Sequence, residues 1–78
     1  MLVYAEYVKI MKNRLKYFRH KLEIDSKREF AKMLEASYRA YIRWEAQEAQ
    51  PDLPSAWKVY KNLKKRIPGL HFEDMFEE

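Results

Sequence analysis

Apolar side chains recur along the chain at steps of three and four residues, the spacing of one face of an α-helix. The first stripe predicts an amphipathic helix over residues 4–22, and its members are Tyr4, Tyr7, Met11, Leu15, Phe18 and Leu22. Residues 2–4 also suit a short strand, and that alternative stays open. Later stripes predict four shorter helices, over residues 26–35, 37–46, 52–66 and 71–77.

Residues that favour helix ends lie at the borders of these stripes. Ser26 and Glu29 have the spacing of a capping box, and Ser37 supplies a side-chain cap for the next helix. Asp52 is a good N-cap, and Pro68 stops the helix that it begins. One glycine and three prolines in 78 residues are few for an all-β chain, which needs many turns. We therefore expect an all-α fold, a compact bundle of about five helices.

The helix over residues 37–46 has two distinct faces. Tyr41 and Trp44 are three residues apart and are expected to face the core. The outward positions hold two arginines, which can each donate two hydrogen bonds to a guanine edge. With them are a tyrosine that can reach a phosphate or a base and an isoleucine that can touch a thymine methyl group. The outward residues are Tyr38, Arg39, Ile42 and Arg43, and a plain solvated face is the alternative.

The helix over residues 26–35 begins with two cations. Lys27 and Arg28 lie in its first turn, where backbone N–H groups are free and the helix dipole is positive. Such a helix start can hold a phosphate, although solvated surface charges are the simpler interpretation.

The charged residues are unevenly distributed along the chain. Residues 1–44 hold 11 Lys or Arg against 5 Asp or Glu, whereas residues 45–78 hold 5 against 7. The basic half contains the two helices just described, which favours a polyanionic partner.

Several classes of function are excluded by what the sequence lacks. There is no cysteine, and His20 and His71 fit no metal spacing, so we expect no metal and no cofactor. There is no Gly-rich phosphate loop, zinc-protease motif or nucleophile elbow, so we expect no enzyme. No stretch suits a signal peptide or a membrane span, and we expect a cytoplasmic protein with no membrane partner.

The ordered set Ser26, Phe30-Ala31, Leu34, Glu35-Ala36-Ser37, Tyr41, Trp44 and Glu45 resembles the helix-turn-helix of the Cro/phage-repressor family, the xenobiotic-response-element type. The resemblance continues weakly downstream and covers about residues 13–76. It implies a lambda-repressor-like DNA-binding domain over residues 13–78, with residues 1–12 as an N-terminal extension.

By this resemblance the protein is a sequence-specific double-stranded DNA-binding regulator, a small bacterial or phage repressor. Its recognition helix, residues 37–45, would lie in the major groove, and its partners would be double-stranded DNA and a second copy in a homodimer. The implied DNA-binding residues are Ser26, Lys27, Arg28, Ser37, Tyr38, Arg39, Ile42 and Arg43. The resemblance also implies a structural ion pair between Arg19 and Glu45.

Some positions depart from the family pattern. Glu35 stands where glycine is common, because the backbone there tends to be left-handed. The connection over residues 20–25 also lacks glycine, so we expect Glu23 or Ile24 to be accommodated without a left-handed backbone, or the first helix to run further. The loop 46–50 lacks the usual glycine and carries Glu48, although Gln47 or Gln50 is able to donate hydrogen bonds to a phosphate.

A second hypothesis follows from these departures and from the apolar extension. The same fold serves as a protein-interaction module in antirepressors, antitoxins and adaptors, and fold alone does not fix function. In that case residues 1–12 would bind a protein partner, and DNA binding would be weak or absent. The extension is otherwise expected to cover the domain or to make a dimer contact.

Overall fold

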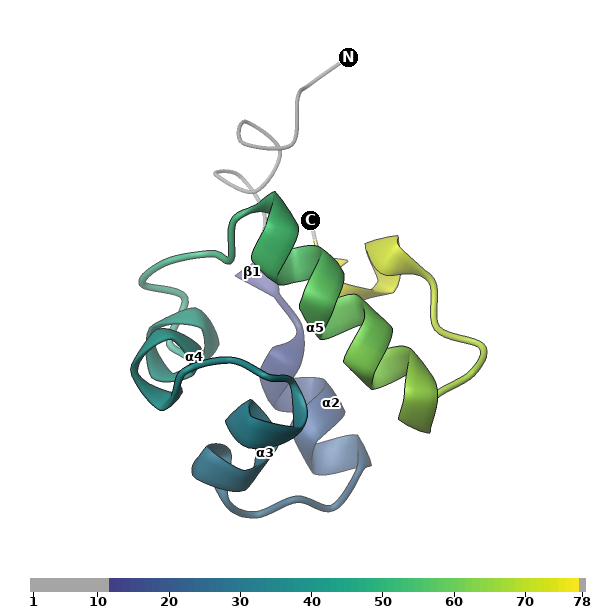
Figure 1. Ribbon diagram of the computed structural model, residues 1–78, viewed down its shortest axis with the longest axis horizontal. Helices are drawn as coiled ribbons and strands as arrows, with labels where there is room; N and C mark the ends of the chain where they lie inside the picture. Colours follow the sequence, from purple (N-terminus) through teal and green to yellow (C-terminus); the bar gives the residue numbers. More distant parts are fainter. Residues whose placement is uncertain (1–11, 78) are drawn as a thin grey trace.

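The computed structural model describes residues 12–77 (Figure 1). Four α-helices make up most of this part of the chain: α2 (Leu15–Lys21), α3 (Lys27–Met33), α4 (Tyr38–Glu45) and α5 (Leu53–Arg66). A short 3-10 helix, η1 (Phe72–Met75), and two short strands, β1 (Lys12–Asn13) and β2 (Phe76–Glu77), complete it. The expectation of a mostly helical, compact fold is therefore confirmed, and the strands are an addition to it.

Three of the helices begin at the side-chain caps that the sequence indicated. The Ser26 hydroxyl accepts a hydrogen bond from the Glu29 N–H at 3.1 Å, and the Ser37 hydroxyl accepts one from the Ala40 N–H at 3.1 Å. The Asp52 carboxylate accepts from the Ser55 N–H at 2.9 Å. Each cap satisfies a backbone donor that has no partner inside its helix, which fixes where the helix starts.

The helices α2, α3 and α4 all end with the same backbone conformation. Each is followed by a residue with a left-handed backbone, namely Glu23 (φ 58°), Glu35 (φ 59°) and Gln47 (φ 62°). After α3, for example, the N–H of Ala36 bonds to the carbonyl of Ala31 at 2.9 Å, as in a Schellman motif. The left-handed conformation expected at Glu35 is present. The expectation that Glu23 would avoid it is wrong, because the chain leaves α2 through the same motif.

The strained position at Glu35 gives a first prediction. We expect Glu35→Gly to raise the free energy of unfolding by about 0.5–1 kcal/mol, because glycine adopts the left-handed conformation without the Cβ clash. Urea unfolding followed by circular dichroism measures the change. Glu29→Gly, inside α3, serves as the matched control and should lower the same free energy. A destabilised Glu35→Gly variant would show that the Glu35 backbone is not strained.

The predicted first helix, residues 4–22, is confirmed over Leu15–Lys21 and is wrong at residues 12–14. Residues 1–11 lie outside the described residues, and so does the open question of a strand at residues 2–4. Lys12 and Asn13 form β1, and the helix begins only at Leu15. The Asn13 side chain accepts a hydrogen bond from the Leu15 N–H at 3.1 Å, and the Arg14 N–H bonds to the carbonyl of Met75 at 2.7 Å. These partners replace the intrahelical ones, so α2 cannot extend towards the N-terminus.

The predicted last helix, residues 71–77, is also only partly present. Its first turn is η1, but Phe76 and Glu77 form β2 and pair antiparallel with β1, with Lys12 opposite Glu77 and Asn13 opposite Phe76. Strand pairing with the beginning of the domain ends the helix after one turn. The helical periodicity of Phe72, Met75 and Phe76 does not reveal this, because the partner strand lies about sixty residues away.

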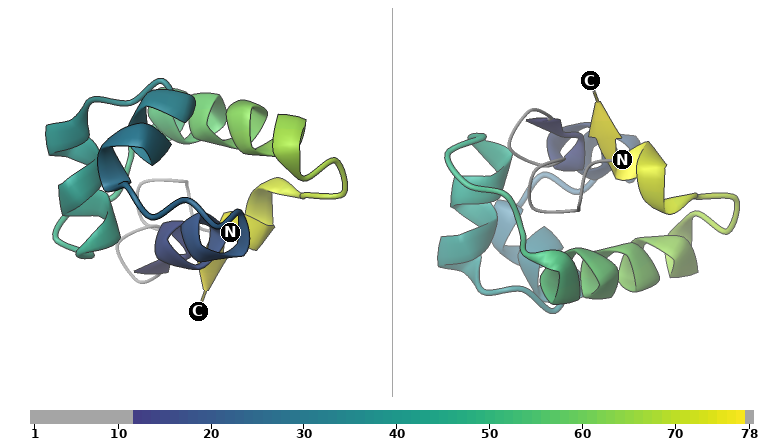
Figure 2. Two further views of the ribbon diagram at one scale, coloured as in Figure 1. Left: turned by 90° about the horizontal axis from the view of Figure 1, so that it is seen from below. Right: turned by 90° about the horizontal axis from the view of Figure 1, so that it is seen from above.

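The core lies between α5 on one side and α2 with the two strands on the other, and α3 and α4 close one end (Figure 2). Its fully buried members come from every helix: Leu15, Phe30, Ala31, Leu34, Tyr41, Ala56, Val59, Leu63 and Met75. The rings of Phe30 and Tyr41 pack edge to face at 5.5 Å and join α3 to α4. The buried Asn62 side chain on α5 donates to the carbonyl of Leu34 at 3.0 Å, which holds the end of α3.

Candidate nucleic-acid interface

A buried ion pair fixes the back of α4. Arg19 Nη2 lies 2.9 Å from Glu45 Oε1 and Arg19 Nε lies 3.3 Å from Glu45 Oε2, so the contact is bidentate. The two side chains are only 7% and 5% exposed. Arg19 Nη1 also donates to the carbonyls of Ile24 and Asp25, each at 3.1 Å. The pair implied by the resemblance is therefore present, and it joins α2, the α2–α3 connection and α4.

The protonation of this cluster follows from its burial and its charges. Burial alone would raise the pKa of the Glu45 carboxyl, but the hydrogen bonds from Arg19, with the charges of Arg19 and Lys27, hold that pKa below its usual range. Burial and the neighbouring Glu45 raise the pKa of the Tyr41 hydroxyl, which stays protonated. The Tyr41 hydroxyl is close enough to Arg19 and Glu45 to be influenced by their charges, yet it makes no well-formed hydrogen bond within residues 12–77.

The lowered pKa of Glu45 predicts how stability depends on pH. A carboxyl whose pKa is lower in the folded state than in the unfolded state stabilises the fold at pH values above its unfolded-state pKa. That stabilisation is lost as the pH falls through the folded-state pKa. We expect the free energy of unfolding to fall as the pH drops below about 4.5, the ordinary value for glutamate. Urea titrations between pH 7 and pH 3 measure this. Glu45→Gln, which cannot titrate, should show a weaker dependence, and an unchanged slope would contradict the assignment.

Two arginines occupy the side of α4 that faces away from the core. Arg39 and Arg43 are exposed and are four residues apart, hence neighbours on one helix face. Neither side chain has an ion-pair or hydrogen-bond partner in the part of the chain that the structure describes. Like charges at this spacing repel each other by a few tenths of a kcal/mol. A bound anion would remove that repulsion.

The first turn of α3 supplies two more cations beside α4. The guanidinium of Arg28 lies 4.0 Å from the centre of the Tyr38 ring, a cation–π contact at the start of α4. Lys27 Nζ lies 3.9 Å from Glu45 Oε1 at the other end of α4. Helical spacing places Ile42 between these cations and the two arginines. We call the resulting area the cationic surface, made of Lys27, Arg28, Tyr38, Arg39, Ile42 and Arg43.

The two serines predicted to contact DNA act as helix caps in the structure. Ser26 and Ser37 each accept a backbone N–H bond, at the start of α3 and of α4. A hydroxyl that accepts one bond still has its own hydrogen to donate. Both serines lie at the edge of the cationic surface, so capping and a phosphate contact are compatible.

The loop after α4 does not offer the hydrogen-bond donors that the sequence suggested. The Gln47 side-chain amide donates to the carbonyl of Asn13 at 3.0 Å, and the Gln50 amide donates to Gln47 at 3.0 Å. Asn13, which is buried, completes the network by donating to the Trp44 carbonyl at 2.7 Å and to Gln50 at 2.9 Å. Sequence reasoning missed this network, because nothing local connects Asn13 to residues more than thirty positions away.

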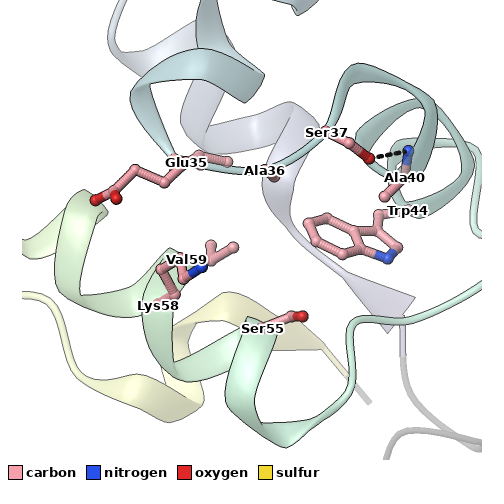
Figure 3. A pocket seen from close by; sticks show the side chains of 9 residues that line it. Glu35, Ala36, Ser37, Ala40, Trp44, Ser55, Lys58 and Val59 are labelled. Atoms are coloured by element: carbon pink, nitrogen blue, oxygen red, sulfur yellow. Dashed lines mark hydrogen bonds between the residues drawn. The ribbon is translucent and has the colours of Figure 1, made fainter.

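A small pocket lies on the other side of α4, between the α3–α4 connection and α5 (Figure 3). Its volume is about 170 Å³, and Trp44 projects into it opposite Val59 and Lys58. Small-molecule sites are usually larger, roughly 300–1,000 Å³. The pocket therefore suits a few water molecules better than an organic effector.

Comparison with protein-family models, with curated proteins and with solved structures gives no match to this chain. Within residues 12–77, no three His, Cys, Asp or Glu side chains gather as a metal site. None of the helices described here is long and apolar enough to cross a membrane. The cationic surface remains the best candidate for a functional site.

Proposed function

We propose that the protein binds double-stranded DNA through the cationic surface, with α3 and α4 acting as a helix-turn-helix and α4 as the recognition helix. The observation that carries the proposal is the pair of exposed, unpaired arginines on α4, opposite a face that the buried Arg19–Glu45 pair holds rigidly. Arg39 and Arg43 would donate to base edges, and Ile42 would contact a thymine methyl group. Lys27 and Arg28 would hold the phosphate backbone.

The dimensions of α4 support this role. An α-helix with its side chains is about 10–12 Å across. The major groove is also about 12 Å wide. The exposed arginines lie about one helical turn apart, roughly 5.4 Å along the axis, which corresponds to base pairs one or two steps apart at roughly 3.4 Å per step.

A single module of this size makes a small interface with DNA, so we propose that it acts as a homodimer on two half-sites. Regulation of transcription, as a small repressor, is the corresponding biological role. The expected half-site spacing is about one helical turn of DNA, roughly 34–36 Å between centres.

Binding to a pool of random duplexes, followed by selection and sequencing of the bound fraction, tests the proposal. Fluorescence anisotropy at two salt concentrations should show an affinity that falls steeply as salt rises, because phosphate contacts release counterions. A palindromic motif in the selected pool would support a dimeric reader of sequence. Absence of binding at low salt would refute the proposal.

A protein-interaction module is the second candidate. The engaged amides of Gln47 and Gln50 and the acidic Glu48 favour it, because the loop after α4 then offers little to a phosphate. Salt-insensitive binding to a protein partner, with no selected DNA motif, would decide for this alternative.

A further inference from the structure

The outward side of α5 changes along its length from apolar to cationic. Leu53 and Trp57 are one helical turn apart and are 49% and 47% exposed. Lys61 and Lys64 follow on the next turns and are also exposed. Helical spacing places these four residues on one side of α5, and we call them the α5 outer face. In both views of Figure 2, α5 forms one outer side of the described domain.

The apolar half of this face is held in place by the aromatic side chains behind it. The Trp57 ring packs at 5.4 Å from Tyr60 on the same helix and at 5.6 Å from Phe72 on η1. The Tyr60 hydroxyl donates to the carbonyl of Leu70 at 3.1 Å, which fixes its ring in turn. A tryptophan that is already packed on one side loses little freedom when a partner covers its other side, and tryptophan is enriched among the residues that dominate protein interfaces. Two adjacent, large, exposed apolar side chains are therefore typical of a contact site.

The charges on α5 are all of one sign. The helix carries five cations and no acidic residue, and the cations are Lys58, Lys61, Lys64, Lys65 and Arg66. The nearest acid before it in the chain, Asp52, is engaged as its N-cap. Cations in the last turn offset the helix dipole, but Lys58 and Lys61 precede that turn. Within residues 12–77, Lys61 has no ion-pair or hydrogen-bond partner, so its charge is available to an acidic group from outside.

This combination selects among the possible occupants of the face. A second copy, docked through the same face about a two-fold axis, would bring two helices together that each carry five cations and no acid, and these would repel each other. A single-stranded nucleic acid would neutralise the lysines and stack on Trp57, but it offers Leu53 no apolar side chain. A protein segment with apolar and acidic side chains satisfies both halves of the face.

We propose that the α5 outer face docks an acidic segment of a protein partner. Large apolar side chains of that segment would cover Leu53 and Trp57, and its Asp or Glu side chains would lie against Lys61 and Lys64. The face belongs to α5, whereas the cationic surface belongs to α3 and α4. The inference therefore does not rest on DNA binding, and either proposal can fail without the other.

Selection of a random peptide library, displayed on phage, against the full chain tests this docking. We expect the enriched peptides to combine aromatic or aliphatic residues with Asp or Glu. A labelled synthetic copy of an enriched peptide then gives the affinity by fluorescence anisotropy. That affinity should fall as salt rises, because exposed charges are screened.

Three variants locate the site of binding. Trp57→Ala should weaken the affinity for the peptide about tenfold or more, since it removes the central apolar anchor. Lys61→Glu should weaken it about fivefold or more, because it places a like charge opposite the acidic side chains. Lys16→Glu, which makes the same charge change at an exposed position on α2, is the matched control and should change the affinity less than about twofold. Circular dichroism shows that each variant is folded, and Lys61→Glu alters no buried group.

Several outcomes would overturn the proposal. One is an absence of enriched peptides, or an enriched set without acidic residues. Another is equal weakening by Lys61→Glu and Lys16→Glu. Self-association in sedimentation that Trp57→Ala abolishes would assign the face to a second copy. Binding of single-stranded oligothymidylate that Trp57→Ala abolishes, with no peptide binding, would assign it to nucleic acid.

Discussion

Arg19→Met is expected to lower the free energy of unfolding by about 3–5 kcal/mol. The variant leaves the Glu45 carboxylate, which is 5% exposed, without its bidentate partner. It also removes the donors to the carbonyls of Ile24 and Asp25. A small domain has a total stability of about 5–15 kcal/mol, so this loss would remove a large part of it. Equilibrium urea unfolding at pH 7, followed by circular dichroism, measures the change.

Two further variants show whether the loss arises from burial of the pair. Lys27→Met removes the other cation near Glu45. Lys27 Nζ lies 3.9 Å from Glu45 Oε1 and the Lys27 side chain is 47% exposed, so this variant should change the free energy of unfolding by less than about 1 kcal/mol. The double variant Arg19→Met, Glu45→Leu removes both charges and should recover much of the loss, because no buried charge is left unpaired. Equal effects of Arg19→Met and Lys27→Met would contradict this account.

On a selected duplex, Arg39→Ala and Arg43→Ala are each expected to weaken binding by about 1–3 kcal/mol and to relax the preference at one base position. This prediction rests on the proposed function. Both side chains are exposed and unpaired within residues 12–77, so their removal should leave the free energy of unfolding within about 0.5 kcal/mol. The affinity of each variant, measured by fluorescence anisotropy at one fixed salt concentration, provides the comparison.

Lys61→Ala is the matched control for these variants. Lys61 is exposed on α5 and carries the same charge, but it lies outside the cationic surface. Its removal should change affinity much less and leave the selected motif unchanged. If Lys61→Ala weakens binding as much as the arginine variants do, binding depends on general charge and α4 does not read bases.

The helices that the sequence predicted well are those whose limits are set locally. Ser26, Ser37 and Asp52 cap their helices through bonds to the third residue along, and the apolar spacing of each helix lies within a dozen positions. Within the candidate site, the exposure of Arg39 and Arg43 follows from the same spacing. The Arg19–Glu45 pair was implied by family resemblance, because no local pattern connects residues 26 positions apart.

The features that sequence reasoning missed depend on distant partners. The first predicted helix does not include Asn13, because the Asn13 side chain bonds to Trp44 and Gln50. The last predicted helix does not include Phe76, because Phe76 pairs with Asn13 in a strand. Glu23 takes a left-handed backbone because the motif at the end of α2 outweighs the intrinsic preference of glutamate. Composition and spacing contain no information on these contacts until the fold brings the residues together.

The strand pair between Lys12–Asn13 and Phe76–Glu77 also couples the two ends of the described chain. The Arg14 N–H that bonds to Met75 at 2.7 Å belongs to the same unit. Opening either strand removes the hydrogen-bond partners of the other, so both strands unfold locally in one event. The amide hydrogen of Arg14, which bonds to the Met75 carbonyl, should therefore exchange with solvent through the opening of this strand pair, so that exchange near the start of the described chain reports on whether its end is in place.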